Sequence, residues 1–411
     1  MEPIVERAAG LDVHQKTVVV CVLVGTAGQR PKKEVKTFGT TLSDLMELRA
    51  WLVERGVTHV GMESTGVYWK PVYAVLEEAK LELIVGNAHH IKNVPGRKTD
   101  VKDAEWIAEL VRHGLIAKSF VPPKPIRELR DLMRYHRKLV NVRSGERNRL
   151  LKLLETANIK LSSVATDVFG KSGRAMLEAI ANGEDSGEAL AGLARGVLKK
   201  KKAALGKALE GRVAEHHRFV LRMQLDRLKA LDADLANLDA YVAQKMEPYQ
   251  SQQRALEQIP GVGPYTARAV IAEIGVDMSV FANAHRLAAW AGVCPGNNES
   301  AGKRLSGRTR KGNVHLRTAL VEASMSAIRK KDSYLRSKYY RLKARLGGKR
   351  ATVAVAHKIL VAAFHILADG TVYQDLGAGY LDTLSKTRTS KHLVSRLQAL
   401  GFRVAIEPTA A

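Results

Sequence analysis

The chain has 411 residues, of which 45% are hydrophobic, so it can bury more than one core and two or three domains are expected. Its net charge of +25 predicts a polyanionic partner, most simply nucleic acid, because neutralised phosphates give affinity that does not depend on sequence. Residues 1–120 carry 16 lysines and arginines against 15 acidic residues, whereas residues 301–350 carry 16 against 2. We therefore expect a near-neutral N-terminal domain that is catalytic or a scaffold, and a nucleic-acid-binding segment near the C-terminal end.

The two cysteines, Cys21 and Cys294, lie far apart and lack metal-site spacing. This pattern predicts a reducing, cytoplasmic environment and argues against zinc. The sequence opens without a signal-peptide pattern, and no uninterrupted apolar run reaches about 18 residues, so neither secretion nor a membrane span is expected.

The first 85 residues alternate between strand and helix patterns. Two β-branched runs joined by a polar turn predict a hairpin, and a third strand, a helix, a strand, a helix and a strand follow. The predicted strands are 10–13, 17–24, 34–38, 58–62 and 81–85, and the predicted helices are 42–54, capped by Thr41 or Ser43, and 72–79. Three meandering strands followed by crossover strands indicate an α/β domain.

Carboxylates stand at the ends of these elements. Asp12 interrupts the first strand and Glu63 closes the fourth. The stretch 96–110 then runs from a basic loop into a helix that carries Asp100 and Asp103 on one side of its first turn. Each alone is explained as a cap, a salt bridge or a solvated acid. Four together favour a divalent cation, magnesium or manganese, bound by hard oxygen ligands.

Three short motifs contain these carboxylates: Gly-Leu-Asp-Val-His at 10–14, Met-Glu-Ser-Thr-Gly at 62–66 and Thr-Asp-Val-Lys-Asp-Ala at 99–104. In this order they resemble the motifs of the DEDD transposases of bacterial insertion sequences. The resemblance implies an RNase H-like, RuvC-type catalytic domain over residues 1–120. It also implies that the metal ligands and catalytic carboxylates are Asp12, Glu63, Asp100 and Asp103.

Residues 121–250 have the pattern of a basic helical arm. The pair Pro122-Pro123 marks its boundary, and leucines between Leu221 and Val242 fit a heptad seam. An internal antiparallel helical hairpin and a dimerising coiled-coil arm both fit this pattern, and neither places a chemical site in the arm.

Residues 251–384 are expected to form a mainly α C-terminal domain, followed by a tail at 385–411. The Gly-x-Gly turn at Gly261 and Gly263 either approaches a phosphate, as in helix-hairpin-helix modules, or is only a tight interhelical turn. Residues 295–317 are polar and cationic, residues 334–350 are basic with tyrosines interleaved, and 351–368 form an apolar core helix. The predicted nucleic-acid-binding residues are Arg97, Lys98, Gly261, Gly263, Lys303, Arg304, Arg308, Arg310, Lys311, Asn313 and Arg317.

Two serines lie among these cations. A serine there is either a phosphate-binding donor or a nucleophile, since nearby positive charge stabilises a developing alkoxide. Residues 298–304, Asn-Glu-Ser-Ala-Gly-Lys-Arg, and the Lys-Gly-Asn at 311–313 resemble the C-terminal domain of the same transposases, where a serine is the nucleophile. By position Ser300 matches that serine and Ser306 is the rival. The family pattern often has glycine where this chain has Ala301.

The resemblance implies a DNA transposase and recombinase in which bound metal positions the scissile phosphate and Ser300 attacks it. A composite site would then be completed by domain movement or by a second subunit, so we expect a dimer or tetramer. The resemblance further implies a structured guide RNA, the bridge RNA. Two other readings stay open: a RuvC-like junction resolvase that activates water, and a non-catalytic nucleic-acid binder. A sugar-kinase-like ATPase is disfavoured because the loop after Asp12 lacks a phosphate-cradling glycine.

Overall fold

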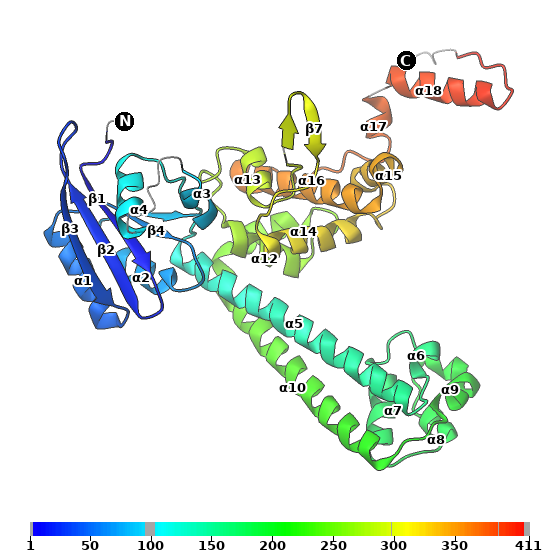
Figure 1. Ribbon diagram of the computed structural model, residues 1–411. Coiled ribbons are helices and arrows are strands. Elements are labelled where there is room, and N and C mark those ends of the chain that lie inside the picture. Colours follow the sequence, from blue (N-terminus) through cyan, green and yellow to red (C-terminus); the bar gives the residue numbers. More distant parts are fainter. Residues whose placement is uncertain (1–2, 95–102, 297, 385, 407–411) are drawn as a thin grey trace. The chain divides into compact units, whose positions relative to one another are not determined.

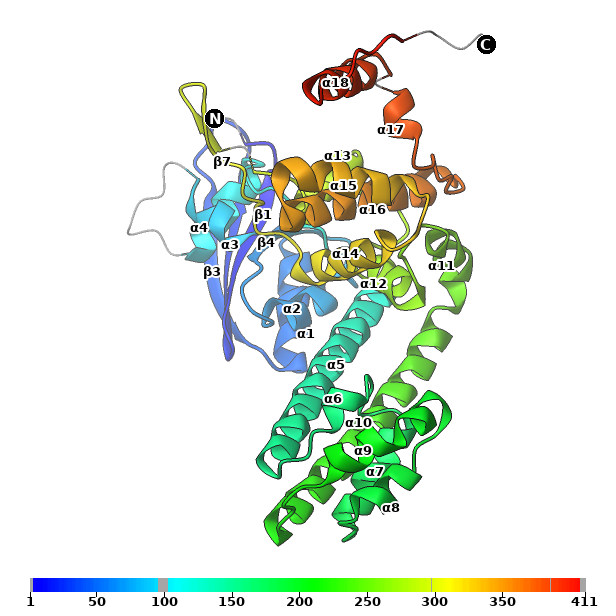
Figure 2. The ribbon, with the colours of Figure 1, turned by 90° about the vertical axis from the view of Figure 1, so that its right-hand side faces the viewer.

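The computed structural model describes residues 3–94, 103–296, 298–384 and 386–406. The chain divides into two compact units, residues 1–121 and residues 122–411. Figures 1 and 2 show that the first unit is built on a β-sheet and that the second is almost entirely helical.

A five-stranded mixed sheet forms the centre of the first unit. Its strands are β1 (Arg7–Val13), β2 (Thr17–Val24), β3 (Lys32–Gly39), β4 (His59–Glu63) and β5 (Glu82–Gly86). The order across the sheet is β3-β2-β1-β4-β5, with β1, β2 and β3 antiparallel and with β4 and β5 parallel to β1. The predicted α/β pattern, a meander followed by crossover strands, is confirmed.

Helices cover both faces of this sheet. The helices are α1 (Leu42–Glu54), α2 (Trp69–Leu76), α3 (Ala88–Lys92) and α4 (Asp103–Arg112). Alternate residues of β1 point to opposite faces of the sheet. Ala9 and Leu11 pack in the core with α1 and α2, whereas Ala8 packs with α4. The cap of α1 is Thr41, which forms a capping box with Asp44.

Two glycines allow α4 to lie directly on the strands. Gly10 of β1 and Gly61 of β4 are partners in the parallel ladder. A Cβ at Gly10 would collide with the backbone of Ala104 and Ala108, and a Cβ at Gly61 would collide with the side chain of Val111. Because glycine carries no Cβ, helix and strand backbones approach closely at this point.

The second unit begins with a long helical hairpin. α5 (Lys124–Thr156) packs along α10 (Glu215–Lys245), and Leu139, Leu231 and Leu235 form part of their apolar contact. The tip is made of α6 (Leu161–Val164), α7 (Lys171–Ala181), α8 (Gly187–Gly192), η1 (Gly196–Lys201) and α9 (Lys202–Leu209). The leucine seam of α10 is thus occupied by α5 of the same chain.

The remainder of the second unit is a helical domain with one small hairpin. Its elements are η2 (Glu247–Tyr249), α11 (Gln250–Glu257), α12 (Pro264–Ile274), α13 (Ala284–Trp290), β6 (Asn298–Ser300), β7 (Lys303–Ser306), α14 (Val314–Ala327), α15 (Tyr334–Leu346), α16 (Gly348–Asp369), α17 (Tyr380–Thr383) and α18 (Lys386–Ala399). By length and composition α16 could cross a membrane, but it packs against α11, α13, α14 and α15 as a core helix of this domain.

Replacing Gly10 with alanine should displace α4 from the sheet. We expect Gly10→Ala to destabilise the first unit by about 1–3 kcal/mol, because the added methyl group meets backbone atoms that cannot rotate away. Gly145→Ala in α5 is the matched control: its Cβ reaches only the end of the Arg149 side chain, so it should stabilise by about 0.5–1 kcal/mol. Urea denaturation followed by circular dichroism measures both, and equal effects would contradict the close-approach explanation.

Candidate functional site

Asp12 and Glu63 lie side by side at the carboxyl end of the central strands. β1 and β4 are parallel with Leu11 opposite Met62, so the next residue on each strand is one of the two carboxylates. Both are two residues beyond the glycines that face α4, and side chains two apart share a face. Asp12 and Glu63 therefore belong to the α4 face of the sheet.

The two carboxylates are only partly buried, and each has a local partner. Asp12 accepts a hydrogen bond from His14 Nε2 at 3.0 Å and is 29% exposed. Glu63 accepts a hydrogen bond from the Thr65 hydroxyl. Glu63 is half-buried like Asp12, so both side chains are partly accessible to solvent.

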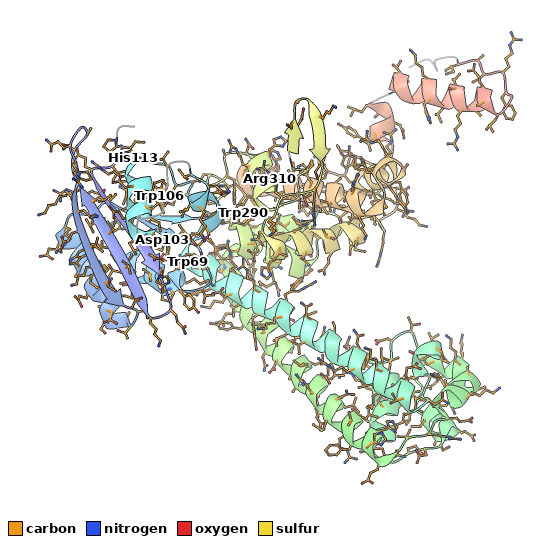
Figure 3. All side chains as sticks on the ribbon, in the orientation of Figure 1. Trp69, Asp103, Trp106, His113, Trp290 and Arg310 are labelled. Carbon is orange, nitrogen blue, oxygen red and sulfur yellow. The ribbon has the colours of Figure 1, made fainter. Side chains whose placement is uncertain are left out.

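Helix α4 begins at this same edge. Its early residue Ala104 lies against Gly10, while its last residue, Arg112, accepts backbone hydrogen bonds from Ile4 and Val5 through its carbonyl. The helix therefore runs antiparallel to β1, and Asp103 at its start lies toward the end of the strand that carries Asp12. Figure 3 labels Asp103 and Trp106 on α4 and His113 directly after its end.

The structure thus places Asp12 and Glu63 at the ends of adjacent parallel strands, and Asp103 at the start of the helix that begins toward the same edge. Asp100 lies outside the described residues, as do Arg97 and Lys98. In the described ranges, no three His, Cys, Asp or Glu side chains are grouped so as to hold a metal ion. Carboxylates are the ligand type that a hard divalent cation prefers, but Asp12, Glu63 and Asp103 do not by themselves form such a group.

The predicted serine lies in a hairpin of the second unit. β6 and β7 pair with Ser300 opposite Lys303, and the two residues between them, Ala301 and Gly302, have φ values of +50° and +73°. Positive φ at both central residues is the pattern of a type I′ turn, which favours glycine at both positions. Ser300 is exposed at the start of this turn.

Ser306 has a different environment. It ends β7 at the base of the hairpin, opposite Asn298, and is half-buried. Its hydroxyl accepts a hydrogen bond from the backbone amide of Arg308 at 3.1 Å. Of the two serines, Ser300 is the one with an exposed hydroxyl beside a lysine.

Backbone contacts fix the base of the hairpin. Pro295 bridges Thr309, and the Gly296 amide donates to the Arg308 carbonyl at 2.9 Å. A Cβ at Gly292 or at Gly312 would collide with the backbone of the other glycine. The chain segments before and after the hairpin therefore contact each other backbone to backbone at these two residues.

Exposed cations surround the hairpin. Lys303 is in β7, and Arg308, Arg310 and Lys311 follow it in the loop that leads to α14. Arg317 is half-buried on α14, and Arg304 is a residue of β7. Contact of these residues with phosphate stays a prediction.

The glycine turn before α12 has two distinct residues. Gly261, with φ +84°, approaches the backbone of Ala323 and Ala327 in α14 so closely that a Cβ would not fit. Gly263 is the N-cap of α12 and faces open space. The packing alternative therefore accounts for Gly261, while contact with a phosphate stays a prediction for Gly263.

Asn313 is bound on both sides of its amide. Its side-chain oxygen caps α14 by accepting from the amides of His315 and Leu316 at 3.1 and 3.0 Å. Its Nδ2 donates to Glu273 Oε2 at 2.6 Å. The end of the hairpin loop is thereby tied to α12.

Glu273 is the buried centre of this network. Its side chain is 3% exposed and accepts two hydrogen bonds from Arg134 at 2.8 Å. Arg130 donates to the Ala272 and Glu273 carbonyls at the end of α12. Burial alone would raise the pKa of Glu273, but the hydrogen bonds and charge of Arg134, with Asn313 and Arg130, lower it below the ordinary 4.5. Burial lowers the pKa of Arg130 to about 10.

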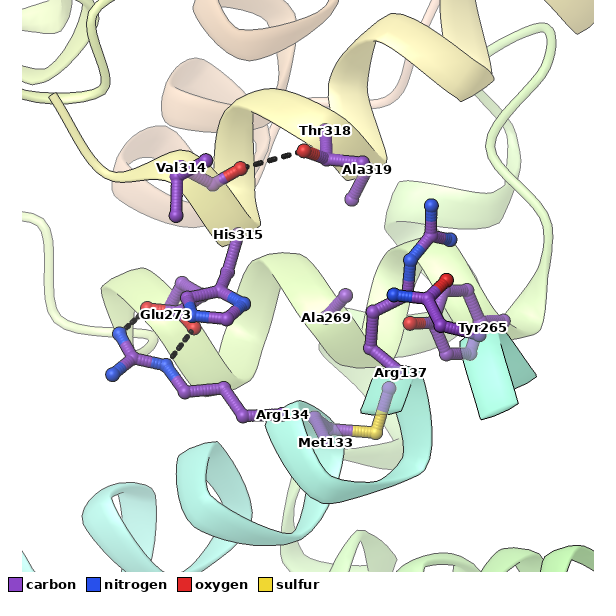
Figure 4. Close-up of a pocket in the computed structure, with 11 residues that line it drawn as sticks. Met133, Arg134, Arg137, Tyr265, Ala269, Glu273, Val314, His315, Thr318 and Ala319 are labelled. Atoms are coloured by element: carbon purple, nitrogen blue, oxygen red, sulfur yellow. Dashed lines mark hydrogen bonds and ion pairs between the residues drawn. The ribbon is translucent and has the colours of Figure 1, made fainter. Parts of the chain in front are cut away.

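Sequence reasoning missed this network because it treated α5 only as an arm. Arg130, Arg134 and Arg137 recur at helical spacing, and that single-face pattern was the available signal. Together α5, α12 and α14 enclose a cavity of about 250 Å³. Figure 4 shows Glu273, Arg134 and His315 on one side of it and Arg137 with Tyr265 on the other.

Two adjacent substitutions in the hairpin turn should have opposite effects. Ala301→Gly removes a side chain from a left-handed conformation and should stabilise the hairpin by up to about 1 kcal/mol, after the entropy cost of glycine. Gly302→Ala adds a side chain at φ +73° and should destabilise it by about 1–2 kcal/mol. Hydrogen exchange of the hairpin amides measures both, and two changes of the same sign would contradict the assigned turn.

Breaking the Glu273 network should be costly and pH-dependent. Glu273→Gln leaves the half-buried Arg130 and Arg134 without their carboxylate and should destabilise the second unit by about 3 kcal/mol near pH 7. Since the folded pKa of Glu273 lies below 4.5, its contribution is present above pH 4.5 and is lost as the pH falls through the folded value.

The pH dependence supplies the control for that variant. The wild-type chain should lose more stability than Glu273→Gln when urea denaturation is repeated between pH 5 and pH 3. Equal losses of stability in the wild type and in Glu273→Gln would show that another titratable group causes the pH dependence of stability.

Two family models match the chain. Residues 9–159 match a model described as a transposase, the DEDD transposase of the IS110 type, and residues 253–341 match the transposase IS116/IS110/IS902 family. The first match contains all four predicted carboxylates and the second contains both serines.

Three relatives agree with these matches. The transposase for insertion sequence element IS1111A of Coxiella burnetii is 33% identical over 32% of this chain and 38% of its own length. The insertion element IS900 uncharacterized 42 kDa protein of Mycobacterium paratuberculosis is 27% identical over 71% of this chain and 80% of its own. A probable family 20 transposase of Pseudomonas aeruginosa is 32% identical over 27% and 32%.

The chain thus aligns with less than half the length of the Coxiella and Pseudomonas relatives and with most of the Mycobacterium one. The sheet order, the carboxylate edge and the two family matches agree with one another. The chain belongs to the IS110 family of DEDD transposases.

Proposed function

We propose that this protein is a DNA transposase that cuts and rejoins the strands of an insertion element. The proposal is supported by the position of Asp12 and Glu63 at the ends of adjacent parallel strands, with the helix that starts at Asp103 beginning toward the same edge, in a chain that matches transposase models. The basic residues of the second unit suit the phosphates of the DNA substrate.

The carboxylate edge is proposed to position the scissile phosphate. Asp12, Glu63 and Asp103, with Asp100, would hold magnesium or manganese, which supplies Lewis-acid stabilisation of charge on the phosphoryl oxygens when bound. His14 beside Asp12 and Thr65 beside Glu63 orient these carboxylates by hydrogen bonds.

Ser300 is proposed as the nucleophile. Its Oγ forms a bond to phosphorus while the bond from phosphorus to one sugar oxygen breaks; the serine proton is released and the departing oxygen takes up a proton. The product is a phosphoserine ester to one DNA end, which keeps the bond energy for rejoining. Lys303, opposite Ser300 in the hairpin, is placed to neutralise the phosphoryl oxygens.

We propose that the active site is composite, formed by the carboxylate edge and the serine hairpin together. Neither the carboxylate edge nor the serine hairpin contains all the groups that the reaction uses, so both must act on one phosphodiester, either within a chain or between chains of a dimer or tetramer. The net charge of +25 also leaves capacity for a structured guide RNA beside the DNA.

The decisive experiment traps the covalent intermediate. Purified protein is incubated with element-end DNA and magnesium, and protein-linked DNA is measured on denaturing gels. Ser300→Ala and Asp12→Asn should each lower adduct formation on the order of 1000-fold or more, whereas Ser306→Ala should keep it within about tenfold. Ribonuclease treatment beforehand should abolish the reaction if a guide RNA is required.

The alternatives give different patterns. Adduct that persists in Ser300→Ala and vanishes in Ser306→Ala assigns the other serine. Strand cleavage without any adduct in the wild-type protein would establish hydrolysis, as in a junction resolvase, and would overturn the transesterification mechanism.

A further inference from the structure

Helix α1 exposes a row of apolar side chains on the side that faces away from its core. Its inner side packs into the core of the first unit. On the outer side Leu42, Met46 and Val53 are 67%, 48% and 54% exposed. The spacings of four and seven residues place the three on one side of the helix, and we call them the α1 stripe. Single exposed apolar side chains are ordinary, whereas a row of them is typical of an interaction site.

Acidic side chains border the α1 stripe. Glu47 and Glu54 directly follow Met46 and Val53 in the helix, and their side chains are 61% and 78% exposed. Each forms an ion pair at the surface, Glu47 with Lys36 and Glu54 with Arg55. Exposed pairs of this kind contribute little free energy, so both carboxylates can accept a further cation from a docked partner.

Helix α18 exposes a second apolar row. Leu393 and Leu397 lie on the helix and Leu400 follows its end, and they are 54%, 42% and 69% exposed. They recur at intervals of four and three residues, so they share one side, and we call them the α18 stripe. The main contact of α18 is with α17, a helix of four residues that is too short to cover this row.

Basic side chains accompany the α18 stripe. From residue 386 to residue 403 the sequence contains five lysines and arginines and no aspartate or glutamate. The exposed Arg396 lies three residues after Leu393 and four before Leu400, so it borders the stripe. The α1 stripe is thus apolar with an acidic border, and the α18 stripe is apolar with a basic one.

We propose that the α18 stripe of one copy of this chain docks on the α1 stripe of a second copy. Each stripe supplies the apolar surface and the charge that the other lacks, and both are left exposed within the single chain. The helices have 13 and 14 residues, so both rows are about 20 Å long.

A two-fold dimer would form this contact twice. One helix pair is small beside the roughly 1,200–2,000 Å² that a stable interface buries, and two-fold symmetry doubles the area because each copy gives its α18 and receives the other. The inference goes beyond the proposed function, since self-association of the chain needs neither DNA nor the strand-transfer reaction.

The first test is disulfide crosslinking between two differently tagged full-length proteins. Met46→Cys is placed in one and Leu397→Cys in the other, both with Cys294→Ser; the native Cys21 is fully buried and stays. After nuclease treatment, mixing and mild oxidation, a disulfide-linked dimer that carries both tags is expected. The control replaces Met46→Cys with Met223→Cys, at an exposed methionine of α10, and should give no such dimer.

The second test measures the dissociation constant of self-association by sedimentation equilibrium, without nucleic acid. Met46→Gln with Val53→Gln, and Leu393→Gln with Leu397→Gln, should each raise the dissociation constant about 100-fold, because two apolar side chains lose their burial. Phe219→Gln with Met223→Gln, the matched control on α10, should leave it within about threefold. Thermal melting confirms that all three variants are folded.

Several results would overturn the proposal. They are a monomeric wild-type protein, unchanged self-association in either stripe variant, and equal losses in the stripe variants and the control. Crosslinking of Leu397→Cys only to itself would show that α18 pairs with another α18. A disulfide that forms only within the chain, when Met46→Cys and Leu397→Cys are combined in one protein, would show that α18 docks on its own copy.

Discussion

The buried carboxylate of Glu273 holds the second unit together at the point where three of its helices meet. It receives Arg134 from α5 and Asn313 from the start of α14, and Arg130 caps the helix on which Glu273 itself lies. A carboxylate inside a protein is stable only when its charge is compensated, and here two guanidinium groups and an amide do this. The long arm, the helical domain and the end of the serine loop are therefore joined through one side chain.

Close backbone contact has the same role in both units. In the first unit Gly10 and Gly61 let α4 lie on β1 and β4, and this contact fixes the place of Asp103. In the second unit Gly292 and Gly312 cross at the base of the serine hairpin. In each case a methyl group would move an element that carries a candidate catalytic residue. The candidate functional groups are exposed or half-buried, whereas a side chain at the glycines that position them would collide with a neighbouring segment.

The charge of the chain is also organised by structure. Arg134 and Arg137 of α5 form ion pairs with Glu273 and Glu322, so these two arginines join helices within the second unit. Several cations around the hairpin and on α15, among them Lys303, Arg308, Lys343 and Arg345, are exposed, and the sequence near α15 contains few acidic residues. The net charge of +25 is thus a mixture of structural and available cations, and only the available ones can contribute to binding of nucleic acid.

The sequence by itself determined the order of strands and helices in the first unit, the carboxylates at the strand ends and the family. These follow from local patterns: β-branched runs, a capping threonine and short motifs are read within a few residues of one another. Only the tertiary structure decided that Gly261 packs against α14, that Asn313 is held by Glu273, and that Ala301 adopts a left-handed conformation. These two contacts and this backbone conformation depend on residues distant in sequence or on backbone angles. A local sequence pattern does not specify which distant residue will be in contact. The leucine seam of α10 shows the same limit, because its spacing fits a partner from another chain as well as α5, and only the fold places α5 against it.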